Sequence, residues 1–351
     1  MPTDPVLPAK PGGGPLRLGV LGCGFWSRFQ LAGWKEVGGV EMVALFNRTR
    51  TKAEALAREF GSAPVYDTAE ELLDRAKPDF IDIITDVGTH APFVRLAAER
   101  KVPVICQKPM APDLSTAEGM VKTCRSAGVP FWIHENWRWQ YPIREFAKTL
   151  REPGLGRCFR ARVTFSNSFP VFDNQPFLKE LERFILADIG SHILDTARFL
   201  FGEAHNLYCR MARVNPSIRG EDVATVMMEM GEGTTVTCEM SYASRLENER
   251  FPQTYILAEC EEGSVELGPG FLLKVTDRNG TRARQVPPPH YPWADPAYDV
   301  VHASIAACNR DLLSALRGEG PGETTGEDNL RTVRLVFAAY ESSATGKAVT
   351  P

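Results

Sequence analysis

The sequence has no concentration of basic residues and no long apolar run. Lys and Arg number 40 against 44 Asp and Glu, which gives a formal net charge of −4. Without a basic patch nothing attracts a phosphate backbone, so nucleic acid is not an expected partner. No apolar stretch reaches the roughly 18 residues of a membrane-spanning helix, and residues 1–14 lack the basic and apolar regions of a signal peptide. We expect a cytoplasmic protein that does not bind membranes.

Close cysteine pairs are also absent. The eight cysteines lie far apart, with no C-x-x-C pair and no Cys/His group, which argues against a disulfide framework and against a structural zinc site. We expect them to be reduced and mostly buried, and we expect no metal site. They are Cys23, Cys106, Cys124, Cys158, Cys209, Cys238, Cys260 and Cys308.

Two patterns of apolar residues follow one another along the chain. From Leu16 to about residue 135, short β-branched runs alternate with amphipathic helical segments, which is typical of a parallel sheet with helical crossovers. After Pro142, longer alternating runs are joined by Gly and Asn turns, which favours an antiparallel sheet. The expected fold class is α/β, with an N-terminal Rossmann doubly wound parallel sheet and a C-terminal α+β domain that has a large, mostly antiparallel sheet.

These patterns divide the chain into four parts. We expect residues 1–14 to form a flexible leader and residues 15–140 a dinucleotide-binding Rossmann domain. Residues 141–325 are expected to form an α+β domain for substrate binding and oligomerisation. Residues 326–351 are expected to form a C-terminal helix that braces the Rossmann domain.

The stretch VLGCGFWS places two glycines between the first strand and the first helix. Gly22 allows a tight turn, and Gly24 lets the backbone approach a pyrophosphate, to which the next helix presents its N–H groups. Ser27 stands where such loops usually carry a third glycine, which weakens the signal. A plain strand-to-helix turn is the alternative.

The end of the second strand has no carboxylate for the 2′-hydroxyl of an adenosine ribose. It reads Phe46-Asn47-Arg48-Thr49-Arg50. Arg48 and Arg50 can neutralise a 2′-phosphate, which favours NADP. Arg48 can equally stack on adenine and leave NAD acceptable. A solvent-exposed basic turn is the third interpretation.

Three polar residues interrupt the apolar helical segment LADIGSHILD. Asp188, His192 and Asp195 are spaced to share one stripe of a helix, and His192 can act there as a general base. The alternative is a helix N-terminal acid beside a buried, hydrogen-bonded histidine. Lys108, in VICQKPMAP, follows a strand at the carboxyl edge of the parallel sheet, where ligands of such folds bind. A surface turn is the alternative for Lys108.

Aromatic and polar side chains are mixed in WIHENWRWQYP and SFPVFDNQPF. Flat rings between amides and charges suit a polyhydroxylated ligand, and Trp139 and Asn174 are the first candidates to contact one. Asn136 and Arg138 are weaker candidates. Rings of this kind also fill gaps between domains, so this alternative stays open.

In chain order, four stretches resemble the motifs of the Gfo/Idh/MocA family, named after glucose-fructose oxidoreductase, inositol dehydrogenase and a rhizopine-catabolism protein. GVLGCG resembles the nucleotide loop, CQKP the Glu-Lys-Pro motif, NWRW the Asn-x-Arg segment, and DIGSHILD the Asp-x-x-x-His helix. The resemblance runs from Leu16 to Val349. Gln107 departs from it, because the family usually has Glu there.

The resemblance implies three sets of functional residues. The catalytic set is Lys108, Asp188 and His192. The cofactor set is Gly22, Gly24, Phe25, Trp26, Asn47, Arg48, Thr85, His90, Gln107 and Lys108. The substrate set is Lys108, Asn136, Arg138, Trp139, Asn174, Asp188 and His192.

The implied function is NAD(P)-dependent oxidation of an aldose at C1 to its lactone, with NAD favoured by the resemblance. The two catalytic segments would meet in a cleft between the domains. Alternatives are another polyol or inositol dehydrogenase, a keto-sugar reductase, or a non-catalytic regulator that binds dinucleotide and sugar. We expect a small sugar as ligand and further copies of the chain as partners, in a homodimer or homotetramer formed through the C-terminal sheet.

Overall fold

The computed structural model describes residues 14–248 and 251–351. The expected leader therefore lies almost wholly outside the described residues. The described chain forms two compact units. The first contains the chain up to Glu135 together with Pro292–Ala294 and Ile305–Val333, and the second contains Asn136–Tyr291, Asp295–Ser304 and Arg334–Pro351.

These units differ from the expected division at the C-terminal end. Residues 305–325 belong to the first unit instead of the second, and residues 334–351 belong to the second. The reason is that helices α9 (Asp299–Leu316) and α10 (Gly326–Thr345) each begin in one unit and end in the other. The sequence pattern can show where a helix begins and ends, but it cannot show that a helix passes from one unit into the other.

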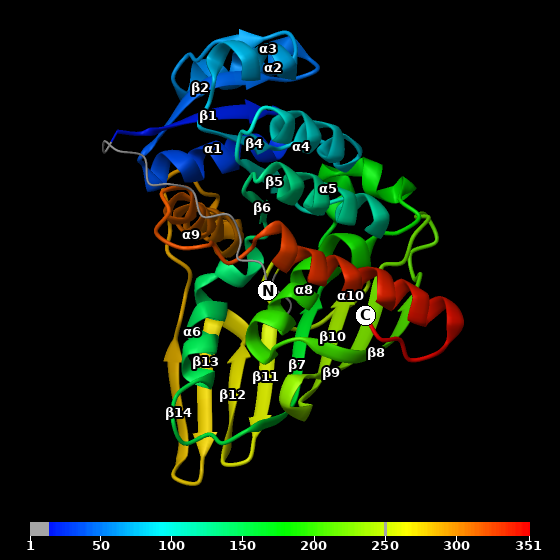
Figure 1. Cartoon of the computed structure of the whole chain (residues 1–351). Helices are drawn as coiled ribbons and strands as arrows, with labels where there is room; N and C mark the ends of the chain where they lie inside the picture. The colour runs from blue at the N-terminus through cyan, green and yellow to red at the C-terminus, as the bar shows by residue number, and fades with distance from the viewer. Residues whose placement is uncertain (1–13, 249–250) are drawn as a thin grey trace. The chain divides into compact units, whose positions relative to one another are not determined.

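The first unit is built on a six-stranded sheet in the order β3-β2-β1-β4-β5-β6 (Figure 1). All of its neighbouring strands are parallel, and the order is that of a Rossmann fold, as predicted. Strands β4, β5 and β6 are buried at every position, as expected for parallel strands that helices cover on both faces. The strands are β1 (Leu16–Leu21), β2 (Val40–Phe46), β3 (Val65–Tyr66), β4 (Phe80–Ile83), β5 (Val104–Gln107) and β6 (Phe131–His134). The helices are α1 (Phe25–Val37), α2 (Arg50–Phe60), α3 (Ala69–Glu71), η1 (Leu72–Ala76), η2 (Val87–Thr89), α4 (His90–Glu99) and α5 (Leu114–Ala127).

The second unit is built on an eight-stranded sheet in the order β14-β13-β12-β11-β7-β10-β9-β8 (Figure 1). Its described pairs are antiparallel except β7 with β10, so the predicted mostly antiparallel sheet is confirmed. Alternate residues of β9 are buried and exposed, and the buried face packs against helix α8. The strands are β7 (Cys158–Ser166), β8 (Ala204–Ala212), β9 (Val223–Met230), β10 (Thr235–Ser241), β11 (Tyr255–Cys260), β12 (Gly263–Gly268), β13 (Leu272–Asp277) and β14 (Gly280–Gln285). The remaining helices are η3 (Trp137–Trp139), α6 (Tyr141–Leu150), α7 (Val171–Asn174), η4 (Pro176–Glu180), α8 (Ile185–Phe201), η5 (Gly231–Gly233), η6 (Pro269–Phe271) and η7 (Pro296–Tyr298).

Helix α9 is the main element that the sequence patterns did not predict. Most of its residues are buried, so it lacks the one-sided polar face by which an amphipathic helix is found. No helix in residues 14–248 and 251–351 has the length and apolar character to cross a bilayer.

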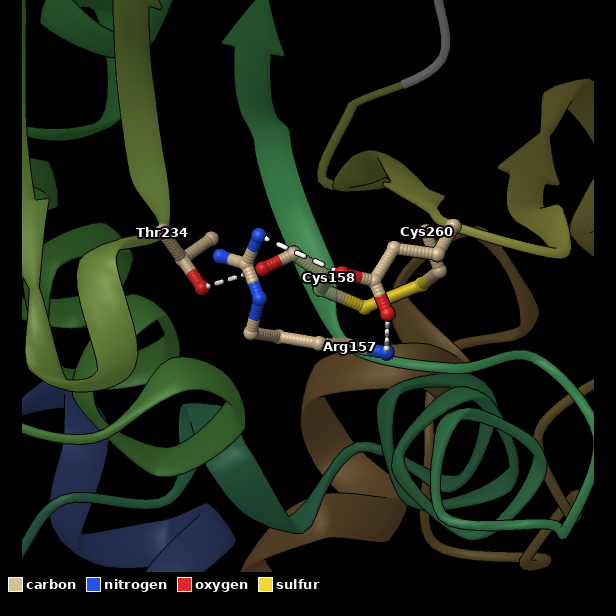
Figure 2. Close-up of a disulfide and its surroundings, with 5 residues drawn as sticks. Arg157, Cys158, Thr234 and Cys260 are labelled. Atoms are coloured by element: carbon tan, nitrogen blue, oxygen red, sulfur yellow. Dashed lines mark hydrogen bonds and ion pairs between the residues drawn. A yellow bond between two sulfur atoms is a disulfide. The ribbon is translucent and has the colours of Figure 1, made fainter.

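The expectation that all cysteines are reduced is wrong for one pair. Cys158 and Cys260 form a disulfide that joins β7 to its neighbour β11 (Figure 2). The two residues are 102 positions apart in the sequence, and only the register of the two strands brings them opposite one another. The other six cysteines form no disulfide and are buried, as predicted.

Candidate functional site

The glycine loop lies between β1 and α1, where the sequence predicts a dinucleotide. Gly22 has φ +103°, and a Cβ added to it would come within 2.2 Å of the Ile84 carbonyl oxygen, so no larger residue fits. A Cβ added to Gly24 would meet no protein atom. Gly24 is the last residue before α1, so the first N–H groups of the helix are open to an anion.

Ser27 explains why a third glycine is not needed. Its side chain is buried, and its hydroxyl donates a hydrogen bond to the carbonyl oxygen of Gly22 at 3.0 Å. The serine therefore packs within the loop and ties α1 to the turn. The exposed Phe25 and its neighbour Trp26 follow Gly24 at the start of α1.

The segment after β2 holds the glycine loop from the other side. The side-chain oxygen of Asn47 accepts a hydrogen bond from the Cys23 N–H at 3.0 Å, and its amide nitrogen donates to the carbonyl oxygen of Thr49 at 2.9 Å. Arg50 forms ion pairs with Glu54 and Asp67. Of the two basic residues considered for a 2′-phosphate, Arg50 is therefore already paired with two carboxylates of the protein.

Arg48 differs from Arg50 because it is exposed and has no hydrogen bond or ion pair with any residue that the structure describes. Of Arg48 and Arg50, only Arg48 is thus left to neutralise a 2′-phosphate, and one arginine alone makes a weak site for it. The planar guanidinium remains free to stack on an adenine ring.

Thr85 and His90 shape the turn that follows β4. Thr85 packs against Gly22, since its methyl group lies 2.7 Å from the position of an added Cβ there. The imidazole of His90 is buried, with Nε2 3.1 Å from the Thr85 carbonyl oxygen and Nδ1 3.2 Å from that of Met110. Burial lowers its pKa. Both nitrogens of His90 therefore face backbone carbonyls and support the turn; its contact with the cofactor stays a prediction.

Gln107 and Lys108 end strand β5, which lies between β4 and β6. Gln107 is buried, and its Nε2 has no hydrogen-bond partner. Lys108 follows it and is half-buried. An unused buried donor at the carboxyl edge of the sheet, together with the open space at Gly24, fits a dinucleotide.

The helix α8 carries the predicted stripe of polar residues in the second unit. The carboxylate of Asp195 is fully buried and accepts two hydrogen bonds from Arg138, at 2.7 Å from Nε and 2.6 Å from Nη2. Arg198 lies 3.6 Å from the same carboxylate. Asp195 therefore holds the segment η3 to α8 and is not a free base. Arg138, expected to contact substrate, is the arginine of this buried pair.

His192 is buried one helical turn from Asp188. Its ring stacks on that of Trp137, with centroids 4.3 Å apart and planes inclined by 20°. The indole nitrogen of Trp137 donates to the Thr254 hydroxyl at 2.9 Å, which fixes the indole. The plane of the His192 imidazole is thus set by an aromatic ring that is itself anchored.

Asp188 lies half-buried in the first turn of α8. The pKa of the buried Tyr242 is raised well above its ordinary value, first by burial and then by the negative charge of Asp188. The two side chains therefore lie close enough to interact. Sequence patterns did not single out Tyr242, because it follows the end of β10 in a stretch without a recognisable motif.

The remaining sugar-contact candidates have different surroundings. The amide nitrogen of the buried Asn136 donates to the Ser304 hydroxyl at 2.8 Å, so the protein already uses this side chain. Trp139 has the guanidinium of Arg144 3.5 Å above its ring, and its buried indole nitrogen has no partner. Asn174 ends α7, and its side chain lies outside the described residues. Trp139 is therefore the candidate with an unused donor.

Two family models match the chain with these features in place. Residues 16–135 match the model described as an oxidoreductase family with an NAD-binding Rossmann fold, and residues 143–266 match the Gfo/Idh/MocA C-terminal domain. The chain belongs to the Gfo/Idh/MocA oxidoreductase family. Its glycine loop, Gln107-Lys108 segment and Asp188–His192 helix thus lie in a member of an oxidoreductase family whose N-terminal model is described as an NAD-binding Rossmann fold.

Members of the Gfo/Idh/MocA family that resemble the whole chain are known. The chain is 41% identical to D-apiose dehydrogenase of Paraburkholderia graminis, covering 94% of this chain and 88% of that protein. It is 40% identical to D-apiose dehydrogenase of Rhizobium rhizogenes, with 95% and 97% covered. The crystal structure of an Agrobacterium radiobacter oxidoreductase in complex with NAD+, L-tartaric acid and magnesium superimposes with a TM-score of 0.93 at 40% identity, covering 95% of this chain and 98% of that one.

Proposed function

We propose that the protein is an NAD-dependent sugar dehydrogenase that oxidises an aldose at C1 to its lactone, and that D-apiose is its substrate. The observation that carries this proposal is the 41% and 40% identity, over nearly the whole chain, to two D-apiose dehydrogenases. The stretches CQKPMAP, IHENWRWQ and SFPVFDNQPF are also similar, on sequence alone, to those of bacterial D-apiose dehydrogenases.

When bound, the nicotinamide supplies the carbon that accepts the hydride. The proposed role of His192 is to take the proton from the substrate hydroxyl as general base. Stacking on Trp137 supports this role, because it fixes the direction in which the imidazole presents its nitrogens. Asp188 orients the substrate or His192.

The proposed role of Lys108 is to donate a hydrogen bond to the same substrate oxygen and to stabilise the negative charge that develops on it. Its position directly after the central strand β5, beside the unused donor of Gln107, supports this role. The proposal requires Lys108 and His192 to reach one oxygen atom. A liganded crystal structure with the two side chains more than about 10 Å apart would be incompatible with it.

NAD rather than NADP is the proposed cofactor. Arg50 is engaged in ion pairs, so Arg48 would face a 2′-phosphate alone. The similar Agrobacterium radiobacter structure contains NAD+. Arg48 would then stack on adenine, and the 2′-hydroxyl would face the Asn47 turn.

A second copy of the chain is the proposed partner, in a homodimer or homotetramer. One face of the eight-stranded sheet carries the half-exposed Met227 and, two strands away, the charged pair Arg160 with Glu259. An apolar side chain among matched charges suits an interface between identical faces. A cytoplasmic location stays a prediction from the sequence.

The test is a panel of aldoses and inositols with both nicotinamide cofactors, followed by absorbance of the reduced cofactor. NADH is expected to appear with D-apiose and to exceed NADPH formation under equal conditions, and the product is expected to be a lactone. Turnover of an inositol but not of any aldose would refute the substrate assignment. Binding of NAD and sugar without any turnover would instead identify a regulator.

A further inference from the structure

The N-terminus of α8, the helix that carries Asp188 and His192, has no capping side chain of its own. The residue before it, Phe184, makes no side-chain cap. The first hydrogen bond within the helix runs from the Asp188 N–H to the Phe184 carbonyl at 2.9 Å. The N–H groups of residues 184–187 therefore need partners from elsewhere in the fold, as the first N–H groups of any helix do.

Two residues far away in the sequence supply all of these partners. Oε1 of Glu221 accepts hydrogen bonds from the N–H groups of Phe184 at 3.2 Å and Leu186 at 3.1 Å. The backbone oxygen of Glu221 accepts from the Ile185 N–H at 3.1 Å. Each of these groups is buried.

The fourth partner is Tyr340, near the end of the chain. Its hydroxyl oxygen accepts from the Ala187 N–H at 3.2 Å, while its hydroxyl hydrogen is donated to Glu221 Oε1 at 2.7 Å. The carboxylate and the phenol thus form one hydrogen-bonded cap over the helix end. Burial and the charge of Glu221 raise the pKa of Tyr340, so its hydroxyl keeps the proton that it donates.

The backbone around Glu221 is built for this close approach. A Cβ added to Gly220 would lie 2.7 Å from the Leu181 carbonyl oxygen and 3.1 Å from the Phe184 nitrogen. On the other side, the carbonyl oxygen of Asp222 accepts from the Tyr242 N–H at 3.0 Å. Residues 220–222 therefore contact both the start of α8 and Tyr242. The negative charge of Asp188 helps to raise the pKa of Tyr242.

We propose that Tyr340 and Glu221 are positioning residues that fix the first turns of α8, and with them Asp188 and His192, in the geometry needed for turnover. This rests on the proposed function. A rigid cap matters because a displacement of about 1 Å of an acid/base group can cost on the order of 100-fold in rate. The cap touches no substrate, so its loss should change the rate more than the binding of either ligand.

Tyr340→Phe removes the hydroxyl and keeps the ring. The matched control is Tyr255→Phe, which removes a tyrosine hydroxyl that donates to the Asn248 carbonyl in the same unit, away from α8. We expect Tyr340→Phe to lower kcat, normalised to NAD-binding sites, by about tenfold or more. KM for the sugar and Kd for NAD should stay within about twofold of wild type, and Tyr255→Phe should keep the wild-type kcat.

If Tyr340→Phe does not yield folded protein, Glu221→Gln gives a second measurement. It keeps an acceptor oxygen and removes the charge, and a fall in kcat without a matching rise in KM is again expected. The inference is overturned if the normalised kcat of the substituted enzyme equals that of Tyr255→Phe, or if only KM changes. If the wild-type enzyme turns over no sugar, the proposed function fails. This result differs from failure of the inference about Tyr340 and Glu221, which requires an active wild type.

Discussion

The carboxyl group of Asp82 should make the stability of the first unit depend on pH. Asp82 lies in the central strand β4 and is fully buried. Its Oδ2 accepts hydrogen bonds from Gln30 Nε2 at 2.9 Å and Trp34 Nε1 at 2.8 Å, while Oδ1 has no partner. Burial raises the pKa of Asp82 from 3.8 to about 6, although the two hydrogen bonds oppose this.

The sign and size of the effect follow from linkage. Between pH 3.8 and about 6 the unfolded chain ionises Asp82 while the folded protein keeps it protonated, so stability is lost as pH rises through this range. A shift of about two units at about 1.4 kcal/mol each amounts to roughly 3 kcal/mol. The effect is complete above about pH 7.

Asp82→Asn is the perturbation, because an amide keeps an acceptor for Gln30 and Trp34 and cannot ionise. The assay is urea unfolding between pH 4 and 8. The free energy of unfolding of Asp82→Asn minus that of wild type should increase by roughly 2.5 kcal/mol from pH 4 to pH 7.5, because at pH 4 the unfolded chain already ionises more than half of Asp82. Asp86→Asn, at the exposed turn after β4, controls for the loss of a negative charge. A difference that stays constant across the range would refute the reasoning.

Three further predictions concern the site and the sheet. Lys108→Ala and His192→Ala should each lower turnover by at least about 100-fold with nearly unchanged NAD affinity in fluorescence titration; wild-type rates in both would contradict their roles. Asn47→Ala loses the hydrogen bonds to Cys23 and Thr49 that hold the glycine loop and should weaken NAD binding by up to about 30-fold in calorimetry, at about 1 kcal/mol for each bond; an unchanged Kd would contradict this. Cys158→Ala removes the disulfide and should lower the free energy of unfolding by about 2–4 kcal/mol under non-reducing conditions; equal denaturation midpoints would contradict it.

The fold could be predicted wherever the pattern of apolar residues along the chain shows which faces of an element are buried. Alternating strands and helices predicted the parallel sheet, because each β-branched run is buried on both faces and each helix on one. The same reasoning could not find α9, which is buried on most sides. Nor could it find the disulfide between Cys158 and Cys260, because cross-strand register depends on the whole sheet.

The candidate site was predictable in its residue types but not in the partners of each side chain. Helical spacing placed Asp188, His192 and Asp195 on one stripe, yet only the structure shows that Asp195 is paired with Arg138. The Asn-x-Arg segment was likewise found from the sequence, but only the structure shows that its arginine forms a buried ion pair. A spacing rule reports which side chains share a face, and it carries no information about the element that packs on that face.

The two ends of helix α8 are each held in place by a charged residue. Toward its C-terminal half, Asp195 is paired with Arg138 of η3, which anchors the helix to the rest of the unit, and with Arg198 of the same helix. At its N-terminus, the fixed negative charge of Glu221 lies where the helix dipole favours it. Each end is thus held by a residue that takes no part in the proposed chemistry. Asp188 and His192 lie between the two anchored ends, so both anchors help to fix their positions.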